Sequence, residues 1–341
     1  IFAFIVYFVA IVGVGIYFFF KEKGDATQAN FFLGGRQMGP WVAAMSAQAS
    51  DMSAWLLMGL PGSILAFGFG QMWIGIGLAL GTAANWIFVA KRLRKFSSAA
   101  GDAITVPQYL GNRFLSKSNA LQVICAIIFF VCFTIYVASA YVAGASVFTA
   151  IFPSLSSHAA MIIFALAMLL ITFFGGFKAV CWTDFFQGIL MFAALMTVPI
   201  VIAITKDMDP AALSVVYSYK DAVSGEMVEC SFGTGLFDAS WQDIISGLAW
   251  GLGYFGMPHI LVRFMSIEKP SMVKKSATVA IIWVICALGC ACLIAYFGRM
   301  FLAEELLTAG AQKMVFIDFA RKLFPSFIAG ILMAAIIAAS M

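Results

Sequence analysis

Long apolar stretches separated by mostly short polar connections dominate the chain. A helix that crosses a bilayer needs about 20 mostly apolar residues. Nine stretches approach or exceed this length, so each predicts one membrane span, and the last is expected to be incomplete. They cover residues 1–20, 40–66, 71–90, 119–152, 158–176, 179–205, 240–265, 277–298 and 324–341.

Two connections are longer than the rest. Residues 91–118 are basic and are predicted to contain a short amphipathic helix near residues 106–114. Residues 206–239 contain Pro210, several glycines and mixed charge, which indicates a partly ordered surface segment rather than a domain. The first apolar stretch is too long for a signal peptide and no small-residue cleavage site follows it, so it is interpreted as a span.

Composition supports a lipid environment. The chain is 63% hydrophobic and 11% charged, whereas a soluble domain carries about 25% charged residues. The lipid bilayer is therefore an expected partner. No basic tract with interleaved aromatics occurs, so nucleic acid is not an expected partner. His158 and His259 lack partners at metal-ligand spacing, and the seven cysteines form no disulfide framework.

Lysine and arginine concentrate on alternate connections, fourteen against six. Connections rich in these residues stay in the cytoplasm. The pattern predicts a multi-pass membrane protein whose N-terminus lies outside; its expected location in the bacterial inner membrane is implied by the family resemblance described below. The fourteen are Lys21, Lys23, Arg36, Lys91, Arg92, Arg94, Lys95, Arg113, Lys117, Lys178, Arg263, Lys269, Lys274 and Lys275.

The second span breaks its own apolar pattern at residues 47–55, which read AQASDMSAW. An aspartate at the centre of a membrane helix costs about 2.5–3.5 kcal/mol on insertion scales. Small and hydroxyl-bearing neighbours can satisfy backbone groups that a helix break frees. Asp51 therefore marks an ion or substrate pathway, or else it pairs with a distant arginine or caps a helix fragment.

The seventh span is interrupted at residues 250–259, which read WGLGYFGMPH. Three glycines and one proline disfavour a continuous helix, since each glycine adds about 1 kcal/mol and proline about 3 relative to alanine. The string also matches G-x-G-x-x-G, but no strand or βαβ unit surrounds it, so a dinucleotide site is not predicted. The segment is either unwound, with Trp250 and Tyr254 facing a cavity, or a simple proline kink.

Two interrupted spans at corresponding places point to an inverted-repeat transporter with its site between them. The predicted divisions are an extra N-terminal helix and loop (1–39), a first five-helix repeat (40–205), an extracytoplasmic loop (206–239) and an incomplete second repeat (240–341). Carbonyl groups freed by the breaks can coordinate a cation, and helix N-termini can hold a carboxylate.

Two weaker polar intrusions lie in the fourth and sixth spans. Asp184 is either a cation relay or an interfacial cap. Tyr136 either lines a cavity for the solute or is an ordinary packing residue of the core.

The chain resembles the solute:sodium symporter family, and within it the sodium/proline symporters. The matching strings are LGGR at 33–36, ASDMS at 49–53, WLLMGLPG at 55–62, FTIY at 133–136, WTD at 182–184, WGLGYFG at 250–256 and PH at 258–259. They occur in the family's order across nearly the whole chain.

This resemblance implies an all-α polytopic membrane protein with a leucine-transporter-like fold and an extra N-terminal helix, truncated before the end of the second repeat. It implies Na⁺ held by backbone oxygens at Ala49 and Met52 together with hydroxyls on the ninth span. The family's serine and threonine ligands are expected just past Met341. Asp51 and Ser53 are implied in sodium and substrate binding.

For the substrate, the resemblance implies a pocket lined by Tyr136, Trp250, Tyr254 and Pro258, with Trp55 and Met257 beside them. It ties Asp184 to sodium passage and Arg36 to the cytoplasmic side. Bacterial proline carriers have glutamine at the position of Met257, and a thioether cannot donate the amide hydrogen bonds. Substrate identity therefore stays open.

The expected function is sodium-coupled import of a small amino acid, proline first, by alternating access. Within the same fold, another amino acid, a sugar, sialic acid or pantothenate is the alternative. An ion channel would need a continuous polar pore lining, whereas the sequence has isolated polar clusters. No catalytic motif such as H-E-x-x-H or G-x-S-x-G occurs, so no enzyme activity is expected.

Overall fold

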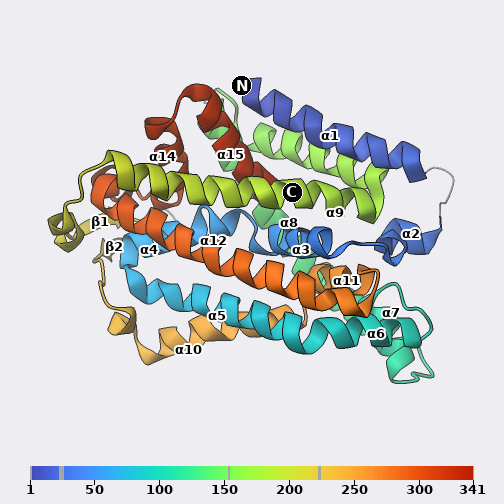
Figure 1. Ribbon diagram of the computed structural model, residues 1–341. Coiled ribbons are helices and arrows are strands. Elements are labelled where there is room, and N and C mark those ends of the chain that lie inside the picture. The colour runs from blue at the N-terminus through green and yellow to red at the C-terminus, as the bar shows by residue number, and fades with distance from the viewer. Residues whose placement is uncertain (1, 23–26, 153, 222–223, 341) are drawn as a thin grey trace.

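The computed structural model describes residues 2–22, 27–152, 154–221 and 224–340. Long helices run along a common axis in both directions (Figure 1). The helices are α1 (Phe2–Glu22), α2 (Gln28–Leu33), α3 (Pro40–Met52), α4 (Gly59–Phe67), α5 (Met72–Ala84), α6 (Lys91–Ala99), α7 (Val106–Arg113), α8 (Ala120–Ile151), α9 (Ser157–Thr205), α10 (Trp241–Ala249), α11 (Pro258–Ser266), α12 (Val273–Phe301), α13 (Ala303–Thr308), α14 (Val315–Leu323) and α15 (Ser326–Ser340).

Each of the nine predicted stretches contains helix. Among the described residues, four helices are long and apolar enough to cross a membrane, and a fifth span results if the bent pair 241–255 and 258–266 is counted as one. Four shorter apolar helices occupy the remaining stretches. Two of these stretches border a break in the helix, at Ser53 after α3 and at Gly176 within α9.

The fifth and sixth predicted spans are joined as α9, with a break at Gly176. Its backbone angles, φ 59° and ψ −176°, are tolerated almost only by glycine. The predicted amphipathic helix near 106–114 is confirmed as α7. The long loop contains a hairpin of β1 (Tyr217–Lys220) and β2 (Met227–Cys230), paired antiparallel.

The connections gather at two ends of the bundle (Figure 1). One end, here called the Arg36 end, holds α2, α6, α7 and the close of α11. The opposite end, called the hairpin end, holds β1, β2 and α14. The basic connections counted in the sequence cluster at the Arg36 end, as an alternating set of spans requires.

The two broken helices run in opposite directions and are joined by backbone hydrogen bonds at both ends. At the Arg36 end, Met38 N donates to Ser266 O at 3.1 Å and Glu268 N donates to Met38 O at 3.1 Å. At the hairpin end, Phe69 N donates to Gly233 O at 2.8 Å. These bonds hold the α3–α4 pair beside the α10–α11 pair.

Glycines allow α5 to pack directly on α10 and on the short 3₁₀ segment η7 (Trp250–Phe255). Gly77 and Gly81 of α5 face Gly247 and Gly251. A methyl group on Gly77 would lie 2.8 Å from Leu248 Cα, and one on Gly247 would lie 2.9 Å from Ile74 N. Both contacts involve backbone atoms, which cannot move aside cheaply. Backbone-to-backbone packing therefore depends on these glycines.

We predict that Gly77→Ala lowers stability by about 1–3 kcal/mol, the usual effect of overpacking. Gly289→Ala in α12 is the matched control, because nothing lies within 4 Å of the added methyl group. Thermal unfolding of both purified variants in detergent measures the difference. Equal unfolding midpoints would show that the α5–α10 contact is looser than described.

Candidate functional site

The first helix break follows Asp51. Helix α3 ends at Met52, and Ser53 has φ 49° and ψ −175°, a region that side-chain-bearing residues rarely adopt. Its Oγ accepts a hydrogen bond from Trp55 N at 3.2 Å, which caps the short turn η2 (Ala54–Leu56). Such a backbone conformation costs of order 1–3 kcal/mol and persists only where its surroundings enforce it.

The second break lies between α10 and α11. Residues 250–255 form η7, Met257 is extended with φ −73° and ψ 107°, and the two helix pieces are bent by 45°. In a continuous helix the Tyr254 carbonyl would accept from residue 258, but Pro258 has no N–H. Asn85 Nδ2 donates to that carbonyl instead, at 2.8 Å. The segment is therefore interrupted as predicted, and Tyr254 lines a small cavity, whereas Trp250 is 55% exposed and lines none of the cavities found among the described residues.

The two breaks meet. The rings of Trp55 and Trp250 stack with centroids 6.2 Å apart and an 18° angle between their planes. The Asp51 side chain faces the Tyr254 hydroxyl. The predicted residues on the two unwound segments therefore share one junction.

Tyr136 joins this junction from α8. Its hydroxyl donates to Ser50 O at 2.9 Å, one of the carbonyls that the end of α3 leaves without a helical partner. Its ring stacks on His259 with centroids 5.6 Å apart. Tyr136 is therefore bound to both broken helices rather than being a plain core residue.

Pro258 is separated from the tryptophan pair. It lines an apolar cavity of about 620 Å³ near the Arg36 end, whose walls also include Phe133, Phe177 and Arg263. Trp55, Trp250 and Tyr254 do not line that cavity. The predicted substrate residues thus fall on two sides of the junction, with the partly buried Met257 at the second break between them.

Asp184 forms a buried ion pair with Arg263. The Asp184 Oδ2 atom accepts from Arg263 Nη2 at 2.6 Å and from Ser46 Oγ at 2.6 Å. Arg263 Nε also donates to Ser46 Oγ at 2.6 Å. Arg263 is 5% exposed inside α11, which corrects its assignment to a cytoplasmic connection. The charges of Asp184 on α9 and Arg263 on α11 therefore compensate each other, and Ser46 of α3 forms a hydrogen bond with both.

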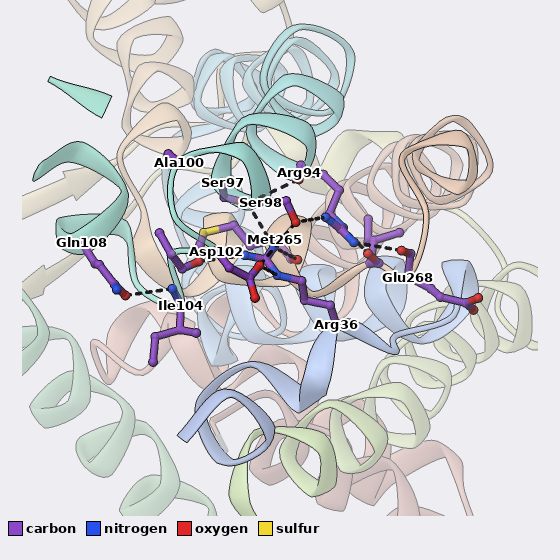
Figure 2. Close-up of polar contacts among 12 residues, drawn as sticks. Arg36, Arg94, Ser97, Ser98, Ala100, Asp102, Ile104, Gln108, Met265 and Glu268 are labelled. Atoms are coloured by element: carbon purple, nitrogen blue, oxygen red, sulfur yellow. Dashed lines mark hydrogen bonds and ion pairs between the residues drawn. The ribbon is translucent and has the colours of Figure 1, made fainter. Parts of the chain in front are cut away.

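Arg36 anchors a second polar network at the Arg36 end (Figure 2). Its guanidinium pairs with Asp102 at 2.9 Å and donates to Met265 O and Ala103 O, each at 2.9 Å. Burial lowers the pKa of Arg36, and the neighbouring Asp102 opposes that shift. An arginine stays charged under such conditions, so the network joins the segment before α3 to the loop that follows α6, at Asp102 and Ala103, and to α11.

Arg94 extends this network, as Figure 2 shows. Its guanidinium donates to Glu268 O at 2.9 Å, to Ser98 Oγ at 3.2 Å and to the Ile267 carbonyl. The arginine fork thereby satisfies carbonyls just beyond the C-terminus of α11. At the Arg36 end, charged hydrogen bonds therefore join α6 to the residues at the end of α11.

Ala49 and Met52, the predicted sodium ligands, are both buried at 3% and 2% exposure. Ala49 packs near Gly188 of α9, a different face of α3 from Asp51. Their role in sodium binding stays a prediction.

A small enclosed cavity beside the junction is lined by residues that sequence reasoning missed. Its walls include Gln48 and Asp51 of α3, Thr82 of α5, Asn85 and Tyr254. Each missed residue is a lone polar side chain in an apolar stretch, as Asp51 is, but amides and hydroxyls are common enough in membrane helices to pass as packing residues. Arg263 was missed because it lies close to a helix end.

Comparison with known proteins extends this picture. The family model of the Sodium:solute symporter family matches residues 31–341. The Sodium/proline symporter 2 of Staphylococcus saprophyticus is 39% identical over 337 residues, which is 99% of this chain and 63% of that protein. The sodium/proline symporter of Staphylococcus aureus is 39% identical over 336 residues, 98% of this chain and 63% of the relative.

A solved structure shares the fold. The substrate-bound, outward-open state of a Na⁺-coupled sialic acid symporter superimposes with a TM-score of 0.73 at 19% identity, covering 99% of this chain and 68% of the other. This likeness confirms the predicted leucine-transporter-like fold. The chain spans 63% of the length of the curated relatives that it matches. On the family match and the near-complete alignment to these relatives, the chain belongs to the sodium:solute symporter family and is a multi-pass membrane protein.

Proposed function

We propose that this protein couples the entry of Na⁺ to the import of a small amino acid, with proline as the substrate. The observation that carries the proposal is the junction of two broken helices around Asp51, Trp55 and Trp250. Relatives that are 39% identical are named as sodium/proline symporters, which supports the choice of ion and solute.

In this proposal Na⁺ binds first, at the carbonyl oxygens of Ala49 and Met52. Asp51 and Ser53 assist because they lie on the same break. Binding relaxes the strained backbone at Ser53 and orders the segment that follows. A cation is the natural ligand for carbonyl groups at the C-terminal end of a helix piece.

The substrate then packs against the aromatic residues of the junction. Trp55, Trp250 and Tyr254 supply an apolar wall for a pyrrolidine ring, Tyr136 fixes the α3 carbonyl beside it, and Met257 and Pro258 border the second break. The N-terminal end of α11 is available to the substrate carboxylate.

The available driving force suffices with one sodium ion per substrate. One positive charge that crosses about 100 mV releases about 2.3 kcal/mol. A tenfold sodium gradient adds about 1.4 kcal/mol. Together these terms support accumulation of a few hundredfold.

We place the Arg36 end in the cytoplasm and the N-terminus of α1 outside. Arg299 of α12 is 1% exposed, so its assignment to an outside connection is corrected in the same way as that of Arg263. After both are removed from the count, thirteen lysines and arginines on the predicted cytoplasmic connections still oppose five on the other side. Residues 40–205 and 240–341 would then be inverted repeats, and the opposite courses of α3–α4 and α10–α11 support that division.

We assign the Arg36 network to the closed cytoplasmic gate. The Asp184–Arg263 pair lies between that gate and the junction, on the path that sodium would take. Opening the path requires the pair to separate or to move as a unit.

Transport of labelled proline into proteoliposomes tests the central proposal. We expect uptake driven by an inward NaCl gradient to exceed uptake in choline chloride by at least about tenfold, because the carrier draws its free energy from sodium entry. Competition by other amino acids, sialic acid, sugars and pantothenate identifies the preferred solute. Uptake that is equal in both salts would refute the coupling, and ion currents far above carrier turnover would indicate a channel.

The buried ion pair gives a second prediction. Arg263→Met leaves the Asp184 carboxylate without its cation and should destabilise the protein by about 3–5 kcal/mol. Adding Asp184→Leu should recover part of that loss, since no charge is then left unpaired. Lys322→Met is the control, because its pair with Glu305 is exposed and is worth about 1 kcal/mol or less.

Thermal unfolding in detergent measures all three variants. A single variant as stable as the control would mean that the Asp184–Arg263 pair is open to water.

A further inference from the structure

The enclosed cavity beside the junction contains three buried oxygen atoms without hydrogen-bond partners. They are Gln48 Oε1, Thr82 Oγ1 and Asn85 Oδ1. All three side chains line the cavity and are at most 4% exposed. Buried polar atoms are paired in the great majority of cases, so three orphans that share one cavity require an explanation.

The Asp51 carboxylate completes the set. It lies on the wall of the same cavity and is partly exposed, so it stands between the buried oxygens and the break in α3. Among the described residues no lysine or arginine forms an ion pair with Asp51, since Arg263 pairs with Asp184. The Tyr254 hydroxyl faces both Asp51 and Thr82, but no hydrogen bond reaches Thr82 Oγ1.

The amide nitrogen of Asn85 fixes the orientation of its side chain. Its amide nitrogen donates to the Tyr254 carbonyl at 2.8 Å, and only an N–H group can make that bond. Oδ1 is therefore the atom left for the cavity. Asn85 also begins a π-helical segment (Asn85–Ala90), a local widening of the helix that is frequent at functional sites.

The chemistry of these atoms selects a cation. Gln48 Oε1, Asn85 Oδ1 and the Asp51 carboxylate are acceptors only, whereas Thr82 Oγ1 can also donate. A water molecule could serve the two amide oxygens and Thr82 Oγ1, but it would leave the negative charge of the Asp51 carboxylate without a balancing cation. A cation satisfies every oxygen at once, and hard cations prefer such oxygen ligands.

Size and charge limit the choice further. The cavity offers about 10 Å³ to the centre of a water-sized sphere, which is room for one small ion. One carboxylate balances one positive charge, while a divalent ion would leave a net charge buried in an apolar surrounding. A small monovalent cation fits both limits.

We propose that this cavity is a second sodium position, formed by Asp51, Gln48, Thr82 and Asn85 at the contact of α3, α5 and η7. It is distinct from the position predicted at the Ala49 and Met52 carbonyls, and it rests on the proposed sodium coupling. Because Asn85 holds the Tyr254 carbonyl and also faces the ion, an occupied site would tie the second break directly to the first.

Thr82→Val tests the site with little side effect. The two side chains have the same shape, and the Thr82 hydroxyl forms no other hydrogen bond that the change would remove. We expect the sodium concentration for half-maximal proline uptake to rise about tenfold, which corresponds to about 1.4 kcal/mol. Thr82→Ser restores the oxygen and should restore the affinity.

Thr197→Val is the matched control, because that exposed hydroxyl donates only to Ala193 O within its own helix. Gln48→Met removes a second ligand at similar length and covers the case in which Thr82→Val fails to fold. An unchanged sodium dependence in both site variants would overturn the proposal and would indicate that the cavity holds only water.

Sodium binding without transport separates this proposal from the proposed function. Titration of the purified protein with NaCl, at ionic strength kept constant by choline chloride, is followed by tryptophan fluorescence, since Trp86 lines the cavity. A titration that is weakened in Thr82→Val supports the site even if proline uptake proves independent of sodium. Sodium-driven uptake with identical titrations in wild type and Thr82→Val would refute the site alone.

Discussion

An interrupted helix inside a membrane exposes carbonyl and amide groups that lipid cannot satisfy. This constraint determines how the two breaks are built. The Ser50 carbonyl receives a hydrogen bond from Tyr136, the Tyr254 carbonyl receives one from Asn85, and the Trp55 amide donates to Ser53 Oγ. Each break is therefore stabilised by side chains that bond its free backbone groups. The same side chains lie around the junction of the two breaks.

Buried charged side chains need partners for the same reason. A buried ion pair breaks about even against apolar residues, but a lone buried charge is strongly unfavourable. Asp184 and Arg263 satisfy each other and also bond Ser46, so three helices share one neutral cluster. Asp51 lies nearby without such a partner among the described residues. Asp51 and Asp184 therefore differ in whether a protein cation lies beside the carboxylate among the described residues.

Much of this arrangement could be predicted from the sequence. Nine apolar stretches located the helices, and the clusters around Asp51 and Gly253 located both breaks because their residue types violate the apolar pattern. The partners of the breaks could not be found in this way. Asn85, Thr82 and Gln48 are single polar residues whose meaning depends on the packing of α5 against η7, and no local pattern encodes that contact. The identity of the partner of Asp184 depended likewise on helix packing.

The backbone bonds at Met38 and Gly233 have a mechanical consequence. They clamp the α3–α4 and α10–α11 pairs to each other at both extremities, so neither helix can peel away alone without exposing unpaired amides. A rearrangement that keeps these bonds moves the two pairs together against the surface of α9 and α12. The pivots then lie in the connections outside the clamp rather than at the breaks themselves.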